Sequence, residues 1–423
     1  MKKSRWLALV SLLSALLLVA SACGEDDDAG GPGAFTPGEL GAVEIGPGEP
    51  LEIGAVQAIS GDVASLGEDQ VRAIEIAIDD LGGEFRGHPI ELSTEDGQCS
   101  AEGGTTATQA LVSNPQIVGI IGTSCSGAGV PASEVMSEAG LTMISGSNTS
   151  PALTSLRDEQ GEAYNSGYFR TAHNDEIQGA AAATFVFEEL DITEAASIHD
   201  GDPYTQGLVS VFDSSFEELG GTIALSTAVS PDQTDMRPVL TEVEASGAQL
   251  LFFPIFQPAG DFIARQAGDV GFGEEVLMGA DGLLSDTFVE IPATEGMYFS
   301  GPGTPTGDAY SEFVSKYEEA YGERPIQSFH GHAYDAANIL LQALEEIVVE
   351  DDDGTLHIDR QGLRDAVAAT EDFEGVTGTL TCGEFGDCAD PNIQVFQNTE
   401  EKETIGQVRG DPLFTYDEEA DGP

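Results

Sequence analysis

The stretch "IVGIIGTSCSGAGVPASEVMSEAGLTMIS", residues 117–145, contains the pattern that decides the fold. An apolar run at 117–123 predicts a buried strand, and small and polar residues follow it. A helix is expected over 130–139, and "LTMIS" (141–145) predicts the next strand. Strand, helix and strand in this order predict two parallel strands joined by a crossover helix.

The same alternation continues on both sides of this stretch. Before it, strands are expected at 51–60 and 90–96, with helices at 68–83 and 101–113. The alternation of strands and helices begins again after 168–174 and continues to about 303. Two further helices and a β-like tail with two late cysteines follow. The sequence therefore predicts an α/β fold with two doubly wound, parallel-sheet lobes.

Composition excludes several classes of partner. The 423 residues include 75 acidic and only 15 basic residues, a formal net charge of −60. Such a polyanion repels nucleic acid and anionic lipid headgroups. Because the acids are spread along the whole chain, we interpret them as a solvated surface suited to salty surroundings.

The first residues have the pattern of an export signal. Lys2, Lys3 and Arg5 precede an apolar stretch at 6–19 that is short for a membrane-spanning helix. "ASAC" (20–23) resembles a bacterial lipobox, which would make residues 1–22 a signal peptide and Cys23 the lipid-modified first residue. An ordinary signal peptide with a chance cysteine is the alternative. Residues 23–50, rich in Gly, Pro and acid, are then expected to form a tether outside the cytoplasm.

Four cysteines remain once Cys23 is set aside. Proximity in the sequence favours the pairs Cys99–Cys125 and Cys382–Cys388, which an oxidising compartment permits. A zinc site made from four thiolates is the alternative, although the chain lacks paired Cys-x-x-Cys elements.

The loop after the strand at 117–123 has three possible chemistries. A serine nucleophile would need Gly-x-Ser-x-Gly, and Ser126 stands where the second glycine should be. "GAGVPA" (127–132) matches a dinucleotide loop, but the next strand ends in "ISGSN" without an acid for a ribose. The third reading is a passive anion-binding loop at a helix start, and we prefer it. No enzyme activity, cofactor or metal site is expected.

Residues near two other strand ends complete this reading. Ser126, with Ser147 or Thr149, could hold a ligand carboxylate. Asp281, at a strand end of the second lobe, could pair with an ammonium group, although an Asx-turn or helix cap is the simpler role for an isolated aspartate. Neutral donors on one lobe and a carboxylate on the other suit a zwitterion.

Several motifs together resemble the leucine/isoleucine/valine-binding protein family, the solute-binding subunits of branched-chain amino acid ABC transporters. They include "ISGDVASLGEDQVRAIEIAIDDLGG", "TEDGQCS", "FRTAHNDEIQG" and "IHDGDPYTQG", with the stretch already quoted. The resemblance implies the type I periplasmic binding protein fold, two lobes joined by a three-strand hinge. We expect 51–170 with 303–395 to form the N-terminal lobe, and 171–302 with 396–423 the C-terminal lobe.

The resemblance also implies a set of ligand-binding residues. Ser126 would grip the carboxylate beside the Cys125–Cys99 bridge, and Asp281 would hold the ammonium. The other positions that match the family's site are Ser147, Asn148 through its backbone, Thr149, Tyr204, Phe256 and Phe329. Leu66 stands where the family often has a tyrosine, Phe256 lacks a hydroxyl, and Asp281 is shorter than the usual glutamate.

The expected function is capture of an amino acid outside the cytoplasm for delivery to an ABC transporter permease. A monomer, attached to the membrane only through its lipid, is expected. Two alternatives stay open: binding of another small solute such as an amide, urea or aromatic acid, and a sensory module that signals rather than transports.

Overall fold

The computed structural model describes residues 35–272, 276–402 and 404–417. The expected signal peptide and Cys23 lie outside this part of the chain. Every element below belongs to the unit Pro37–Pro423. No helix among the described residues is both long and apolar enough to cross a bilayer.

The first sheet has six strands in the order β3-β4-β2-β5-β6-β9. All its pairings are parallel except that of β3 with β4. The strands are β2 (Leu51–Gln57), β3 (Glu84–Phe85), β4 (His88–Asp96), β5 (Ile117–Gly122), β6 (Met143–Ser145) and β9 (Tyr168–Arg170). Strand β5 is buried along its whole length, which explains its continuous apolar sequence.

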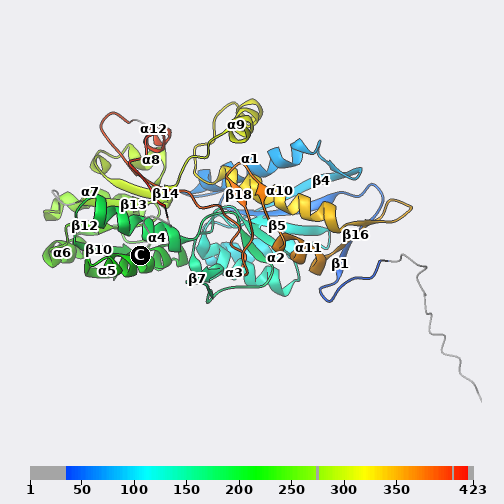
Figure 1. Cartoon of the computed structure of the whole chain (residues 1–423), viewed down its shortest axis with the longest axis horizontal. Coiled ribbons are helices and arrows are strands. Elements are labelled where there is room, and N and C mark those ends of the chain that lie inside the picture. Colours follow the sequence, from blue (N-terminus) through cyan, green and yellow to red (C-terminus); the bar gives the residue numbers. More distant parts are fainter. Residues whose placement is uncertain (1–34, 273–275, 403, 418–423) are drawn as a thin grey trace, which may run out of the picture. The chain divides into compact units, whose positions relative to one another are not determined.

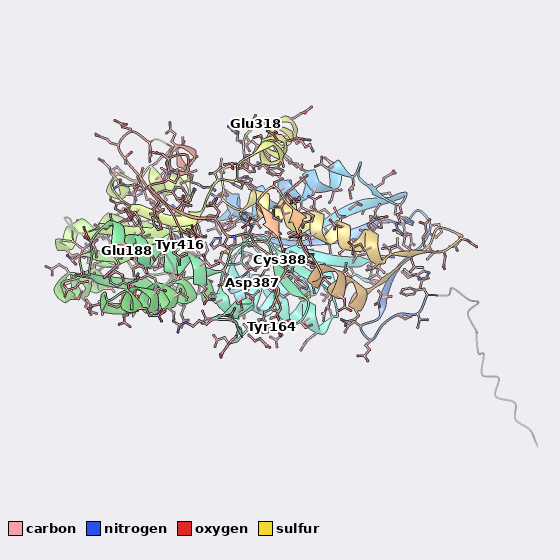
Figure 2. The ribbon with its side chains drawn as sticks, viewed as in Figure 1. Tyr164, Glu188, Glu318, Asp387, Cys388 and Tyr416 are labelled. Atoms are coloured by element: carbon pink, nitrogen blue, oxygen red, sulfur yellow. A yellow bond between two sulfur atoms is a disulfide. The ribbon has the colours of Figure 1, made fainter. Side chains whose placement is uncertain are left out.

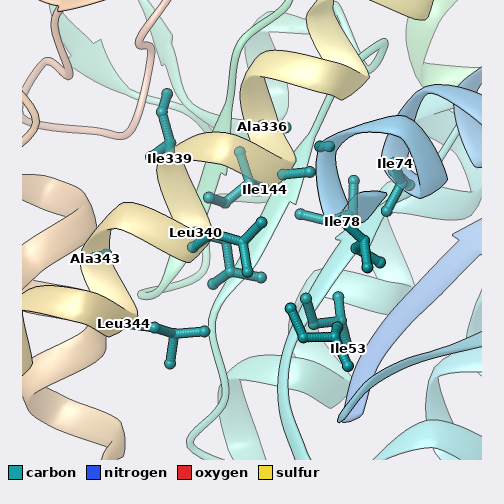
Figure 3. Close-up of a cluster of buried hydrophobic side chains, with 14 of the residues drawn as sticks. Ile53, Ile74, Ile78, Ile144, Ala336, Ile339, Leu340, Ala343 and Leu344 are labelled. Carbon is teal, nitrogen blue, oxygen red and sulfur yellow. The ribbon is translucent and has the colours of Figure 1, made fainter. Parts of the chain in front are cut away.

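Helices cover this sheet and create its core. They are α1 (Ala64–Asp80), α2 (Ala101–Val112), α3 (Ser126–Glu138), α9 (Asp308–Tyr321), α10 (His330–Ile347) and α11 (Arg360–Ala368). Helices α1 and α10 pack side by side on the sheet (Figure 1). Ile74 and Ile78 of α1 meet Leu340 and Ile144 in this core (Figure 3). A Cβ at Gly119 would lie 2.8 Å from Leu340 Cδ1, so a larger residue there would require the Leu340 side chain to move.

The second sheet has seven strands in the order β11-β10-β12-β13-β14-β19-β20. Its first five strands are parallel, and the last two run antiparallel to their neighbours. The strands are β10 (Glu194–His199), β11 (Thr222–Ala228), β12 (Leu250–Phe252), β13 (Val276–Ala280), β14 (Tyr298–Pro302), β19 (Ile393–Gln397) and β20 (Phe414–Thr415). A fold of two largely parallel sheets agrees with the alternation in the sequence.

Two buried clusters, one on each face, hold the second sheet. The helices around it are α4 (Asp175–Thr184), which continues as a π-helical turn (Phe185–Glu189), α5 (Pro203–Glu218), α6 (Arg237–Ser246), α7 (Ala259–Ala267), α8 (Asp286–Val289) and α12 (Ile405–Arg409). We call the first sheet with its helices lobe 1 and the second sheet with its helices lobe 2.

The chain crosses between the lobes three times. It leaves lobe 1 after β9, returns after β14 to begin α9, and leaves again between Cys388 and β19. At the crossings, the buried Arg170 donates from Nε to Asp387 at 2.5 Å. Asp387 and Cys388 are adjacent just before the third crossing (Figure 2). The first and third connections are therefore linked by an ion pair.

Two segments differ from the expectations. Within the expected tether 23–50, Ala42–Ile45 forms strand β1, which pairs antiparallel with β16 (Leu356–Asp359), itself paired with β15 (Val349–Glu350). The β-like tail contains the helix α11 and one two-stranded ribbon, β17 (Phe373–Glu374) with β18 (Thr379–Leu380). Another short ribbon, β7 (Ser155–Leu156) with β8 (Glu159–Gln160), lies between β6 and β9. Strand β19 begins at Ile393, inside the range 303–395 that was expected in the first lobe.

Both disulfides form as the cysteine spacing predicted. Cys99 pairs with Cys125, and Cys382 pairs with Cys388. Cys125 directly precedes α3, so the first bridge fixes the start of that helix to the loop before α2.

Candidate functional site

A cavity of about 110 Å³ lies between the two lobes. Its walls come from loops at the carboxyl ends of parallel strands, where open α/β sheets bind their ligands. From lobe 1 it is lined by Asp62, Val63, Ser65, Leu66, Ser124, Cys125, Ser126, Ser147, Thr149, Gln327, Ser328 and Phe329. From lobe 2 it is lined by Tyr204, Phe256, Gln257, Asp281, Gly282, Ser285 and Thr287.

The wall from lobe 1 offers hydroxyl groups at a helix start. Helix α3 begins at Ser126, four residues earlier than expected, so this serine stands at the positive end of the helix dipole. Ser126 Oγ accepts from the Ser150 N–H at 3.2 Å, which leaves its own proton for another acceptor. Ser147 Oγ donates to the Ser124 carbonyl at 2.8 Å and accepts from Gln70 Nε2 at 2.9 Å. No lysine, arginine or histidine lines this described cavity, so only neutral donors could hold a carboxylate.

Thr149 and Asn148 follow β6 but have different surroundings. Thr149 lines the cavity, whereas Asn148 does not. Asn148 Oδ1 accepts from Thr123 Oγ1 and from the Tyr168 hydroxyl, and its N–H donates to Ser145 Oγ. The Asn148 backbone is engaged within the protein, and the backbone contact to a ligand that we expected from it stays a prediction. Arg170 Nη1 donates to the carbonyls of Asn148 and Ser150, which holds this loop in place.

Asp281 presents the negative charge on the opposite wall. Its Oδ1 accepts from Gln178 Nε2 at 2.7 Å and from the Tyr204 hydroxyl at 3.1 Å. Burial raises the pKa of Asp281 to about 6, although both hydrogen bonds lower it. Gln178 is itself fixed by a hydrogen bond with His173. These two hydrogen bonds hold the carboxylate in one orientation, and a cation could form a further interaction with it.

A second buried acid lies near Asp281. Asp175, in the first turn of α4, is fully buried. Burial raises the pKa of Asp175 well above its usual value, and the charge of Asp281 raises it further. The charge of Arg170 acts in the opposite direction, and Asp175 does not line the cavity.

Aromatic and aliphatic side chains close part of the cavity. The rings of Tyr204 and Phe256 lie 5.1 Å apart at an angle of 41°. Phe329 stacks on His173 with 5.9 Å between ring centroids, and Leu66 adds an aliphatic surface from α1. Burial lowers the pKa of His173 to about 4, so this histidine is neutral near pH 7.

The lobes touch each other beside the cavity. The Gly127 N–H, in the first turn of α3, bonds to the Asp202 carboxylate, which also caps α5 by accepting from the Tyr204 N–H at 2.8 Å. Ser150 Oγ donates to the Pro203 carbonyl at 2.9 Å. A Cβ at Gly127 would overlap the Asp202 carboxylate. A side chain at this position would therefore require the Asp202 carboxylate to move.

Eight of the nine expected ligand-binding residues line this one cavity; the exception is Asn148. Their role in binding stays a prediction. Sequence reasoning missed three residues that line the cavity, namely Gln257, Gln327 and Ser328. It also missed three that lie outside the lining and act on residues of the site or beside it, namely Gln178, Asp175 and Asp202. The aspartate before proline in "DGDPYTQG" is a helix-capping signal that could have indicated Asp202.

Comparisons with known proteins agree with this geometry. The chain is 25% identical to Leu/Ile/Val-binding protein homolog 3 of Brucella melitensis, over 82% of this chain and 91% of that protein. It is 30% identical to an amino acid binding protein of Pseudomonas aeruginosa, over 58% of this chain and 63% of that protein.

Solved structures show the same fold. The leucine binding protein LivK of Thermotoga maritima superposes with a TM-score of 0.76 at 22% identity, over 88% of this chain and 99% of that chain. A solute binding protein of R. palustris in complex with benzoate gives 0.69 at 18% identity, over 86% and 96%. These matches confirm the type I periplasmic binding protein fold and the resemblance found in the motifs. The family model described as "Periplasmic binding protein" matches residues 50–392, and the chain belongs to that family.

Proposed function

We propose that this protein is an extracytoplasmic, lipid-anchored solute-binding protein that captures a free amino acid and delivers it to an ABC transporter permease. The observation that carries the proposal is the pair of walls in one cavity. Ser126 and Thr149, at and near the start of α3, face a ligand from lobe 1, and the Asp281 carboxylate lines the wall from lobe 2. A zwitterion satisfies both walls. Two similar proteins are named for leucine, isoleucine and valine or for amino acids in general.

The chemistry requires binding and no bond cleavage. A ligand carboxylate would accept from the Ser126 hydroxyl, which stands at the positive end of the α3 dipole. The ligand ammonium would donate to Asp281, in a site whose burial strengthens charge-assisted hydrogen bonds. Micromolar affinity would correspond to about −8 kcal/mol.

Closure of the two lobes would couple capture to delivery. The three connections between the lobes suit hinge motion, and a ligand that touches both walls favours the closed form. The permease would then recognise the closed form. Division of the chain into two moving bodies at these connections is part of this proposal.

The test is replacement of Asp281 by alanine. A thermal-shift screen of the amino acids first identifies the best ligand, and calorimetry then measures its affinity. We expect Asp281→Ala to abolish detectable binding, because the ligand ammonium loses its counter-charge in a buried site. Asp269→Ala, which removes an exposed acid of lobe 2, is the matched control and should bind normally.

Two outcomes contradict the proposal. One is unchanged amino acid binding by Asp281→Ala. The other is tighter binding of uncharged amides or of benzoate than of any zwitterion, which would favour a different small solute.

A further inference from the structure

The cavity has a third side, and its chemistry bears on which amino acid fits. This argument rests on the proposed function, which places the ligand carboxylate at α3 and its ammonium at Asp281. The ligand side chain then meets the remaining walls. Their apolar part consists of Val63, Leu66, Phe256 and Phe329. Between these lie the polar side chains of Ser65, Gln257, Ser285, Thr287, Gln327 and Ser328.

Ser328 is the most informative of these residues. It lines the cavity and only 3% of its surface is exposed. Its Oγ has no hydrogen-bond partner within the described part of the chain. A buried hydroxyl without a partner is unfavourable, and a methyl group would leave it so. A hydrogen-bonding group on the ligand would satisfy it.

Two glutamines present fixed amides to the same space. Gln257 Oε1 accepts from Ser285 Oγ at 2.7 Å and Thr287 Oγ1 at 3.0 Å. Gln257 Nε2 donates to Asp261 Oδ1 at 2.9 Å, which uses one of its two N–H groups.

Gln327 Nε2 donates to Ser65 Oγ at 2.9 Å. The backbone N–H of Gln327 donates to the buried Asp69 at 2.7 Å, so the residue is held at both ends. The two amides together therefore offer a preorganised donor and a preorganised acceptor to a ligand.

Charge restricts the side chain further. Among the described residues that line this side, the only acid is Asp62, which is exposed. Asp62 also lines an adjoining cavity of about 520 Å³ together with Asp200 and Asp202. An acidic side chain would meet this negative field without a basic partner in the described lining. A solvated Asp62 needs no cation, whereas the buried Ser328 does need a hydrogen-bonding partner.

We propose that the ligand is an amino acid with a short, uncharged, hydrogen-bonding side chain, a hydroxyl or a carboxamide, and that Ser328, Gln257 and Gln327 select it. Aliphatic amino acids would then be the weaker ligands, because they leave these polar groups without partners.

Isosteric ligands test this on the unaltered protein. Threonine and valine have nearly the same shape, as do asparagine and leucine, so each pair isolates the hydrogen-bonding group. We expect calorimetry to show that threonine binds at least about tenfold more tightly than valine, or that asparagine binds at least about tenfold more tightly than leucine. Aspartate should bind more weakly than asparagine.

The outcomes separate this inference from the proposed function. Tighter binding of valine and leucine than of their polar isosteres, or tightest binding of lysine, overturns the inference and leaves amino acid capture intact. Binding of no amino acid overturns both.

A variant of Ser328 tests whether this residue causes the preference for polar over aliphatic ligands. Ser328→Ala should reduce the polar-over-aliphatic preference by about tenfold while valine and leucine bind as well as before, because the methyl group needs no partner. Ser315→Ala, at an exposed position of α9, is the matched control and should keep the full preference. An unchanged preference in Ser328→Ala removes Ser328 from the selecting set and contradicts the proposal.

Discussion

At the scale of single residues, the buried acids in and beside the cavity govern how binding depends on pH. Burial raises the pKa of Asp281 and of Asp202 to about 6, against a usual value near 3.8. Ligand-free protein therefore takes up protons on these groups as the pH falls through 6. The nearby buried histidines remain neutral in this range, because burial lowers the pKa of His173 to about 4 and that of His332 to about 3.

We expect affinity for the amino acid to fall as the pH is lowered below about 6. The ammonium needs an ionised Asp281, so each proton taken up before binding must be released, and affinity drops by up to about tenfold per pH unit. Calorimetry at pH 5, 6, 7 and 8, in buffers with different heats of ionisation, measures both the affinity and the protons released.

Substitutions of the two acids show which of them causes the pH dependence of the affinity. Asp281→Asn should bind weakly and show little pH dependence, whereas Asp202→Asn should keep the slope due to Asp281. A flat profile for the unaltered protein between pH 5 and 7 would contradict an Asp281 pKa near 6.

Some of these residues could be predicted from the sequence and others could not. Ser126, Tyr204 and Asp281 each follow a strand end in a recognisable motif, so their positions in one cavity could be expected. Gln178 lies within the motif "FRTAHNDEIQG", but its role depends on a bond to Asp281, more than 100 residues away. Ser328 could not be identified from the sequence, because its importance depends on burial and on a hydroxyl that has no partner within the described residues.

At the scale of elements, α3 shows how packing overrides local propensity. The residues "SGAGVP" have two glycines and a proline, which are poor helix formers, so the sequence predicted a later start. Tertiary contacts require this composition: Gly127 admits Asp202, and a Cβ at Gly104 would overlap the Ala128 backbone. Strand β1 escaped prediction because its partner β16 lies more than 300 residues further along the chain.

Replacement of Gly127 tests the contact between the lobes. An alanine favours a helix in isolation, so Gly127→Ala should not unfold α3. Its Cβ would overlap the Asp202 carboxylate, so we expect the lobes to be held apart and the affinity to fall by about tenfold or more.

Gly268→Ala is the matched control, because a Cβ there meets no atom within 4 Å and the backbone has φ of −64°. Small-angle scattering should show a more open molecule in the presence of ligand for Gly127→Ala alone. Ligand-bound compaction equal to that of the unaltered protein would contradict the role of this contact.

At the scale of the whole molecule, the dominant feature is the large excess of acidic over basic residues. Fifteen basic residues can pair one-to-one with only 15 of the 75 acids, about one in five. The remaining carboxylates repel one another. Their repulsion reaches about 10 Å at 0.1 M salt and about 3 Å at 1 M.

We therefore expect the melting temperature to rise by several degrees between 0.1 and 1 M KCl, as measured by calorimetric scanning. A sucrose series of equal osmolality controls for general exclusion of the solute from the protein surface. A melting temperature that stays constant or falls with KCl would show that charge repulsion contributes little to stability.

The two-lobed architecture itself was predictable, because alternating strands and helices leave few arrangements other than parallel sheets. The position of the third crossing, which leads into β19, could not be predicted, because five residues in an irregular tail give no periodic signal.

The guanidinium of Arg170 links a connection between the lobes to one wall of the cavity. One of its nitrogens bonds to Asp387 beside the third crossing, and another holds the carbonyls on either side of Thr149. A bend at the crossings would therefore also move the wall of the cavity at Thr149. Under the proposed function, separation of the lobes by the permease would itself weaken the contacts to the bound amino acid, so release would need no separate trigger.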